Sequence, residues 1–405
     1  MINNSSIRRI AACIGLMGPC IACAQSAVSS NAFNPALSMI VDGKYAHYSL
    51  DPAHYGIAGF LIGDETGLPP KGFSLGETEL AASANVDDRY YGQVTLSLAT
   101  RDDGSTVVNI EEAFVQTTSL PDGITLKAGR FFSDIGYLNS KHAHAWDFID
   151  QPLAYKAMLG SQYGDDGVQA RWVIPADLLV EVGAEAFRGT QFPAGGAAHG
   201  GVGSWSAFAH FGGDVGNTSS WRAGASYLNT SAQARESTLA NGDAVVYNGT
   251  SKLWIADFVW KWADHGNPKT RNFVLQAEYL RRREQGTVQD TTLDYSVLAF
   301  VPDVGYSGAQ QGFYAQATYQ FMPRWRVGAR YDHLTAANQG PTLGVPTPLN
   351  DTHDPSRVTA MVDFSNSEFS RVRLQAARDE SRSQPDTQLT LQYVMSIGAH
   401  GAHQF

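Results

Sequence analysis

Cysteine is almost absent from the sequence, since its three cysteines, Cys13, Cys20 and Cys23, all lie within the first 23 residues. This distribution excludes a disulfide framework, a cysteine-based zinc site and a cysteine nucleophile for the rest of the chain. Long apolar runs are also missing. No stretch beyond the N-terminus approaches the roughly 18 consecutive apolar residues of a transmembrane helix, so the sequence predicts no such helix.

Basic charge is scarce as well. The 405 residues include 29 Lys and Arg against 39 Asp and Glu, which gives a formal charge of −10. A nucleic-acid-binding protein needs a basic face, so the sequence predicts no nucleic-acid partner. The hydrophobic fraction of 43% is low for a bundle of membrane helices. The 40 glycines and 11% aromatic residues fit a chain of many short strands.

The N-terminus has the three parts of a secretory signal peptide. Arg8 and Arg9 precede a short apolar run over residues 10–21, and Ala22-Cys23-Ala24 forms a small-residue cleavage site. We therefore expect residues 1–24 to be removed. Residues 25–36 are then a short periplasmic segment, and 37–405 form the folded domain.

Apolar and polar residues alternate with period 2 along much of this domain, which is typical of strands with two different faces. Residues 310–321 show it best. Phe313, Tyr319 and Phe321 share one face with two alanines, and Gln316 and Thr318 lie on the other. The polar faces also carry Arg and Glu, which would be costly in the core of a soluble β-sandwich. We therefore favour a barrel with a lipid-facing exterior over a sandwich.

The connections between these strands alternate between short and long. Short ones include 121–123, 175–177 and 322–323, and the long ones lie near 49–72, 137–167, 188–202, 231–250, 283–308 and 334–355. With two brief connections on the long side, the tally is seven turns and eight loops, hence sixteen strands. The sequence thus predicts an all-β, transmembrane, antiparallel β-barrel with short periplasmic turns and long extracellular loops.

The end of the chain agrees with this interpretation, because an apolar face continues from Leu391 in the last strand to the terminal Phe405. A last strand that ends in Phe resembles the assembly signal of bacterial outer-membrane proteins. The resemblance implies the outer membrane of a Gram-negative bacterium. The implied partners are outer-membrane lipid, lipopolysaccharide and the barrel-assembly machinery, with no cofactor.

Sixteen strands is the size of a porin, which leaves a water-filled channel. The segment 128–132, Ala-Gly-Arg-Phe-Phe, is similar to phosphate-selective (O/P) porins. Segments 33–36, 142–146 and 398–403 resemble outer-membrane proteins loosely labelled TonB-linked or zinc-responsive. The resemblance to porins implies passive diffusion of small polar or ionic solutes, with a homotrimer as one of the assemblies left open. The alternative is a zinc-linked uptake or accessory protein.

The third connection on the loop side of the barrel, Tyr137–Gly167, follows one long and one brief connection and contains Trp146, Asp147 and Asp150. In porins the third outside loop folds inward, and a loop this long usually has a function. We therefore expect it to narrow the pore.

His142 and His144, two residues apart, are metal-ligand candidates if the loop is extended there, with Asp147 as a third ligand, and the alternative is that they are solvated loop histidines. No set of Ser, His and Asp can be singled out by spacing, so the sequence indicates no enzyme.

Strand parity then assigns the residues that line the pore. The candidates are inward-facing charges grouped on two opposite walls: Arg282, Arg324, Arg326, Arg330, Arg371 and Arg373 on one, and Glu77, Glu79, Glu181 and Glu185 on the other. Arginine facing glutamate would create a transverse field across the channel. Glu111 and Glu112 are adjacent in one strand, so only one of them is expected to point inward.

Overall fold

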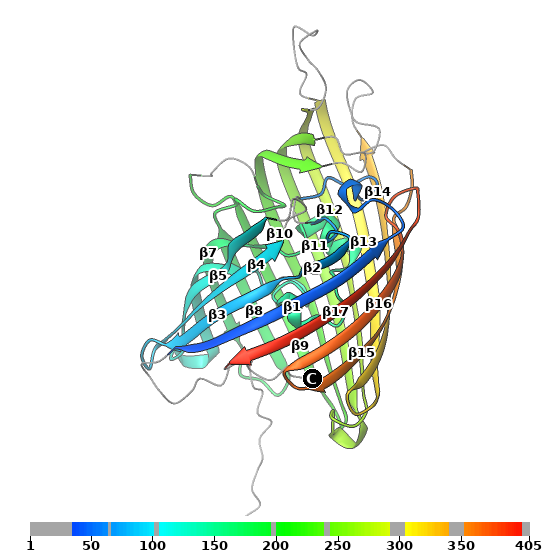
Figure 1. Cartoon of the computed structure of the whole chain (residues 1–405). Coiled ribbons are helices and arrows are strands. Elements are labelled where there is room, and N and C mark those ends of the chain that lie inside the picture. Colours follow the sequence, from blue (N-terminus) through cyan, green and yellow to red (C-terminus); the bar gives the residue numbers. More distant parts are fainter. Residues whose placement is uncertain are drawn as a thin grey trace, which may run out of the picture.

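The structure is a computed structural model that describes residues 35–63, 66–100, 105–195, 200–238, 244–291, 304–339 and 352–398. Its strands form one closed antiparallel barrel (Figure 1). The expected signal peptide, Phe405 and the last two histidines lie outside the described residues. Among the residues described, no helix combines the length and the apolar character needed to cross a membrane.

The barrel closes between its first and last strands. Strand β1 (Ala36–Tyr48) pairs antiparallel with β17 (Asp386–Gly398) from Ser38↔Gly398 to Tyr48↔Gln388. On its other side β1 pairs with both β2 (Gly72–Leu75) and β3 (Thr78–Asn85), which are two parts of one barrel strand. The barrel therefore has the predicted sixteen strands.

Each remaining strand pairs with its sequence neighbours. They are β4 (Tyr90–Thr100), β5 (Thr106–Thr117), β6 (Ile124–Phe132), β7 (Gly164–Val173), β8 (Leu179–Phe187), β9 (Ser204–Val215), β10 (Ser219–Thr238), β11 (Ala244–Ala263), β12 (Asn272–Asp290), β13 (Val304–Met322), β14 (Trp325–Gln339), β15 (Ser356–Ser367) and β16 (Ser370–Glu380). Within the described ranges, the helical elements are α1 (Leu153–Leu159) and the short 3-10 turns Pro52–His54, Pro121–Gly123, Ala143–Ala145 and Asp264–Gly266.

Short and long connections lie at opposite ends of the barrel, as predicted. At the turn end, residues 323–324 and 368–369 join neighbouring strands. At the loop end, loop 1 (49–71), loop 3 (133–163) and loop 4 (188–203) are among the longest connections. The expected long loop at 231–250 is wrong, since β10 and β11 leave only 239–243 between them. In these extensions the inward face becomes apolar, since Ala232 of β10 and Val245 and Tyr247 of β11 are buried in a second apolar cluster, so the regular alternation ends before the strand does.

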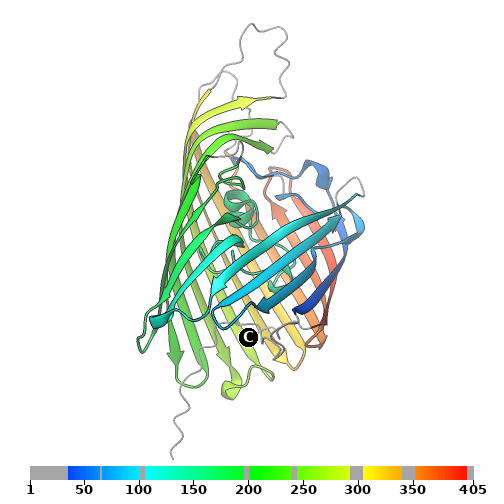
Figure 2. The ribbon, with the colours of Figure 1, turned by 90° about the vertical axis from the view of Figure 1, so that its left-hand side faces the viewer.

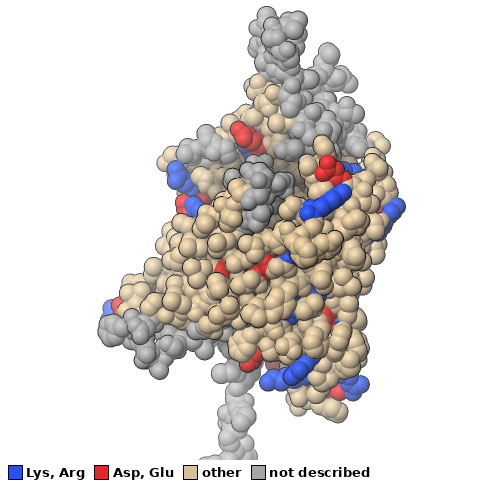
Figure 3. Space-filling view, in the orientation of Figure 1, with Lys and Arg blue, Asp and Glu red and all other residues tan. Residues whose placement is uncertain are grey.

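The two faces of the wall differ as the alternation predicts. Outward-facing Phe313 and Tyr319 are exposed, whereas inward-facing Gln316 is 4% exposed. Uncharged side chains make up most of the face in Figure 3, and most of the charged ones visible there lie toward its two ends. The wall is thus apolar toward its surroundings and polar toward the lumen.

An apolar core lies inside the barrel. Every residue of α1 is buried, and the helix packs against the inner faces of β12, β13 and β14 (Figure 2). Loop 1 adds Tyr55, Ile57 and Phe60, each at most 6% exposed, to the same core. Loops 1 and 3 therefore fill part of the lumen.

Candidate functional site

Loop 3 enters the lumen directly after β6. The main-chain N–H of Asp134 donates to Glu185 Oε1 of β8 at 2.9 Å, and the Ser133 hydroxyl also hydrogen-bonds to Glu185. Gln169 of β7 donates to the same carboxylate at 2.7 Å. Glu185 thus faces inward as predicted, but it binds the start of the loop.

Glu278 of β12 holds the next part of the loop from the opposite wall. Its carboxylate accepts the N–H groups of Tyr137 and Leu138 at 3.1 and 3.2 Å and the Tyr155 hydroxyl at 2.8 Å. Gly136, with φ +66°, lies so close that a Cβ there would be 2.5 Å from Glu278 Oε2. The strand parity of Glu278 was available in the sequence, but we did not identify it.

Arginines on the wall of β14 and β15 bind the middle of loop 3. Arg326 Nη1 lies 2.9 Å from Asp147 Oδ1, and Arg330 Nη2 lies 3.0 Å from Asp150 Oδ1. Arg357, which the sequence analysis did not select, also pairs with Asp150. The predicted constriction residues Asp147 and Asp150 therefore lie inside the barrel, against the predicted arginines.

Asp150 is surrounded by cations. Burial alone would raise the pKa of its carboxyl, but Arg357, Arg330 and Lys156 hold that pKa well below its usual value. Lys156 of α1 lies 3.6 Å away. Asp150 is therefore ionised at neutral pH and joins the loop, the helix and the wall.

Strand β16 completes this anchor. Arg371 donates to the main-chain oxygen of His144 at 2.7 Å, and Arg373 donates to that of Trp146 at 2.8 Å. Gln375 accepts the N–H of Ile149 at 2.8 Å. The arginines expected to line the pore thus hold loop 3 in the lumen.

The arginine wall also carries carboxylates that the sequence analysis missed. Asp363 lies 2.6 Å from Arg326, Asp332 lies 3.0 Å from Arg330, and Asp379 lies 3.6 Å from Arg357. These aspartates offset much of the positive charge, so this wall generates a weaker field than one made of arginines alone.

Two predicted pore-lining arginines are placed differently. Arg324 lies in the turn between β13 and β14 with an exposed side chain, so its assignment to the wall is wrong. Arg282 faces inward but is 0% exposed, with its guanidinium 3.8 Å from Glu284 and near the ring of Phe192 in loop 4. It is therefore sealed beneath the loop. Glu181 is half-buried toward the turn end, 3.4 Å from His210.

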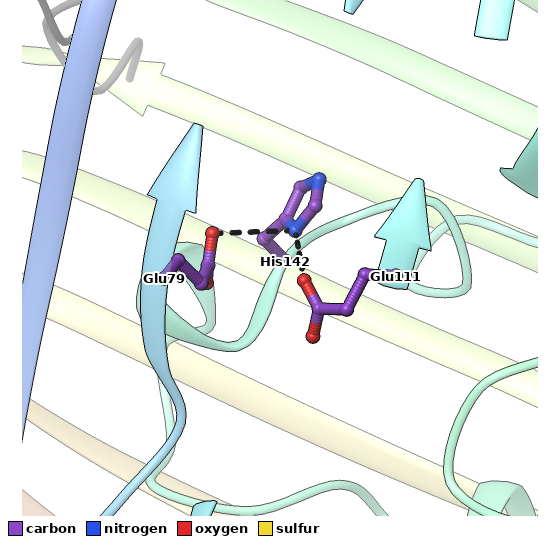
Figure 4. Close-up of side chains that lie close together, drawn as sticks. All are labelled: Glu79, Glu111 and His142. Carbon is purple, nitrogen blue, oxygen red and sulfur yellow. Dashed lines mark hydrogen bonds and ion pairs between the residues drawn. The ribbon is translucent and has the colours of Figure 1, made fainter. Parts of the chain in front are cut away.

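A second cluster joins loop 3 to β3 and β5 (Figure 4). His142 Nδ1 lies 3.4 Å from Glu79 Oε2 and 3.2 Å from Glu111 Oε2, and its Nε2 lies 3.0 Å from Glu112 Oε2. Nδ1 of His144 lies 2.6 Å from Glu79 Oε1. The expected third partner, Asp147, is instead paired with Arg326, so that part of the histidine prediction is wrong.

The two histidines differ in charge. Burial alone would lower the pKa of His142, but its hydrogen bonds to Glu111 and Glu112 and the charges of Glu112 and Glu79 raise it well above the usual value. For His144, burial together with the charges of His142 and Arg371 lowers the pKa to about 3. His144 is thus neutral, and its Nδ1–H donates to Glu79.

Adjacent Glu111 and Glu112 both reach His142, contrary to the strict alternation we expected. Thr95 of β4 pairs with Glu112, whereas the next residue, Leu96, pairs with Ile110. Glu111 is therefore the extra residue of a β-bulge, which redirects a side chain from its regular face.

One sequence segment, Gly72–Gly76, has the G-x-S-x-G spacing of a hydrolase nucleophile turn. Its Ser74 lies within β2, opposite Lys44 of β1. The nucleophile of that motif requires a sharp turn between a strand and a helix. The segment is therefore an ordinary part of the barrel wall.

Several solved outer-membrane proteins have a similar fold. The outer membrane channel DcaP of Acinetobacter baumannii is 12% identical, with a TM-score of 0.53 over 90% of this chain and 97% of that one. OprB of Pseudomonas putida is 13% identical, with a TM-score of 0.52 over 90% and 94%. OmpT of Vibrio cholerae, in a trimer form, is 10% identical, with a TM-score of 0.53 over 90% and 99%. These likenesses establish the fold as that of outer-membrane porins.

No protein-family model matches the sequence. An uncharacterized protein of Aquifex aeolicus is 30% identical over 414 aligned residues, which cover 94% of this chain and 82% of that protein. Since the identity extends along nearly the whole barrel, the chain belongs to the same family as this Aquifex aeolicus protein.

Proposed function

We propose that the protein is an outer-membrane porin that lets small polar or ionic solutes diffuse passively through a water-filled lumen. The observation that carries this proposal is loop 3, which folds into the barrel and is bound by charged groups on both walls. A polar wall narrowed by an inward loop selects solutes by size and charge.

The distribution of side chains supports a place in the outer membrane. An arginine facing lipid at mid-membrane costs about 2–4 kcal/mol. Arg330 and Arg373 face inward, at 2% and 1% exposure, while Leu374, which follows Arg373 in β16, is exposed on the outside. We expect the short turns to face the periplasm and the loops to face the exterior.

The free passage is proposed to follow β3 to β8. On the opposite side the apolar core of loops 1 and 3 fills the lumen against β12 to β14. Along β4 to β8, inward-facing Gln93, Lys127, Arg171 and Glu181 are only half-buried. A passage confined to one side of the barrel admits only small solutes.

The structural neighbours support a channel more than metal-linked uptake. They include an outer membrane channel and an anion-selective porin from Comamonas acidovorans. A phosphate-selective type is less well supported, because many lumen arginines already pair with carboxylates. We expect no enzymatic activity. A homotrimer stays our prediction, and OmpT of Vibrio cholerae has a trimer form.

Swelling of liposomes tests this function. Vesicles containing the folded protein are diluted into isotonic solutions of uncharged solutes of increasing size. Swelling should be fast for the smallest and fall steeply as size increases, whereas vesicles with boiled protein should not swell. Equal rates for folded and boiled protein would contradict the proposal.

A further inference from the structure

The cluster around His142 has the spacing of a metal site. One ligand atom from each of Glu79, Glu111 and His142 lies within 4.8 Å of the other two. Atoms bound to one tetrahedral ion at about 2.1 Å lie about 3–3.5 Å apart. The separations from His142 Nδ1, 3.4 and 3.2 Å, fall in that range. The side chains of His142, Glu79 and Glu111 are 19%, 4% and 8% exposed, respectively, so they are shielded from bulk water.

Two of the three proposed ligands, His142 and Glu79, each have a further hydrogen-bond partner that orients the side chain. His142 Nε2 faces Glu112 Oε2 at 3.0 Å, which leaves Nδ1 directed at the two other carboxylates. Glu79 Oε1 accepts from His144 at 2.6 Å, while its Oε2 faces His142. A carboxylate on the outer nitrogen of a histidine is the usual support of a metal-bound imidazole.

Negative charge is concentrated at this point. Four glutamates, 77, 79, 111 and 112, surround His142, and the carboxyl of Glu77 hydrogen-bonds to that of Glu111. Buried carboxylates that approach one another favour either a proton or a bound cation between them.

Irregular backbone brings these side chains together. Glu111 is the bulged residue of β5. A second irregularity lies on the other side of β4, between β2 and β3. Ile40 of β1 pairs with Glu79 and Gly43 of β1 pairs with Leu75, so the three residues 76–78 lie opposite only two residues of β1. Such bulges often occur beside functional sites, where they redirect side chains. Two of them flank the same cluster.

We propose that a divalent first-row transition-metal ion binds between His142 Nδ1 and the carboxylates of Glu79 and Glu111 and fastens loop 3 to β3 and β5. A nitrogen and two carboxylates suit Zn²⁺ and its neighbours in the series better than Mg²⁺, which prefers oxygen ligands alone. The ion replaces the proton on Nδ1 and offsets the charge of the glutamates. The site goes beyond the channel function, because it concerns how the loop is held.

Calorimetric titration of untagged, folded protein in detergent with ZnCl₂ tests this site. The expected result is one equivalent of Zn²⁺ per chain and no comparable binding of MgCl₂. H142Q and E111Q should weaken Zn²⁺ binding at least about 100-fold, and E112Q about 10- to 100-fold, as for loss of an outer partner. The control is E181Q, which alters a Glu–His pair with a single carboxylate and should leave Zn²⁺ binding unchanged.

Unboiled mobility on gels confirms that each variant is folded. Absence of a stoichiometric site in the folded wild type, or equal Zn²⁺ affinity in H142Q and E111Q, would overturn the proposal and leave the cluster as an ion-pair network. The titration needs no transport, so its failure is distinguishable from failure of the channel function.

Discussion

Asp147 of loop 3 and Arg326 of β14 lie 179 residues apart in the sequence and are joined by a 2.9 Å ion pair inside the barrel. Asp363 binds the same guanidinium from the wall at 2.6 Å. The contact shows how the loop is held, since arginines that the sequence assigns to the inner wall bind the loop that folds into the lumen.

Replacing Asp150 with Asn should destabilise the folded barrel. The change leaves Arg330 and Arg357, each about 2% exposed or less, without their loop carboxylate. Removing one partner of a buried ion pair costs about 3–5 kcal/mol. The temperature at which folded protein converts to the unfolded gel form should fall by several degrees.

The matched control is D264N. Asp264 pairs with Arg271 at the turn end, where the Arg271 side chain is 53% exposed, and such surface pairs contribute about 0–1 kcal/mol. A conversion temperature for D150N as high as that of D264N would show that Asp150 does not anchor the loop.

The contribution of Asp150 should depend on pH in one direction. Its folded pKa lies well below the unfolded value of about 3.9, so its stabilisation is fully present above that value and is lost as pH falls through the folded pKa. The difference in conversion temperature between wild type and D150N should be constant from pH 7 to about pH 5. It should shrink only in stronger acid. A difference that disappears near pH 6 would rule out this charged anchor.

Replacing Arg371 with Gln should raise the preference of the channel for cations. Arg371 donates to the main-chain oxygen of His144 rather than to a carboxylate, so its charge acts on the lumen close to Glu79, which binds the imidazole of the same histidine. R324Q is the control, because Arg324 lies in an exposed turn. Reversal potentials across a tenfold KCl gradient measure the effect. It should weaken in high salt, where the screening length falls to about 3 Å at 1 M. Equal shifts for R371Q and R324Q would contradict the placement.

Removing Phe405 should lower assembly into the outer membrane without lowering export across the inner membrane. The expectation rests on the apolar face of the last strand, which leads toward this residue. Quantifying the heat-modifiable form in outer-membrane fractions tests it, with total exported protein as the reference. Equal folded amounts for the truncated and full-length chains would show that the residue is not an assembly signal.

The sequence was sufficient to predict the barrel, its strand number and the inward loop. Period-2 alternation is imposed by lipid outside and polar groups inside, so it is visible wherever a strand crosses the apolar band. The alternation ends beyond that band, so the sequence predicts a loop where β10 and β11 in fact extend.

The site was less accessible for specific reasons. Extending the alternation across a turn assigns Arg324 to the inner wall, although the residue lies in the turn itself. A β-bulge, which the sequence does not reveal, brings Glu111 to the same side as Glu112. Partners such as Glu278 come from the far wall, so no local spacing reveals them. One signal was missed: apolar residues in loop 1, among them Phe60, indicate a loop that packs inward.

Single-channel conductance in a planar bilayer tests the central claim most directly, namely that loop 3, tied inside the barrel, limits a water-filled channel. Wild type should give discrete steps. The double variant D147N/D150N, which removes the loop carboxylates that pair with Arg326, Arg330 and Arg357, should loosen the middle of the loop and give steps about twofold larger or more. Wild-type protein that is folded but gives no steps, or a folded double variant with unchanged steps, would contradict the claim.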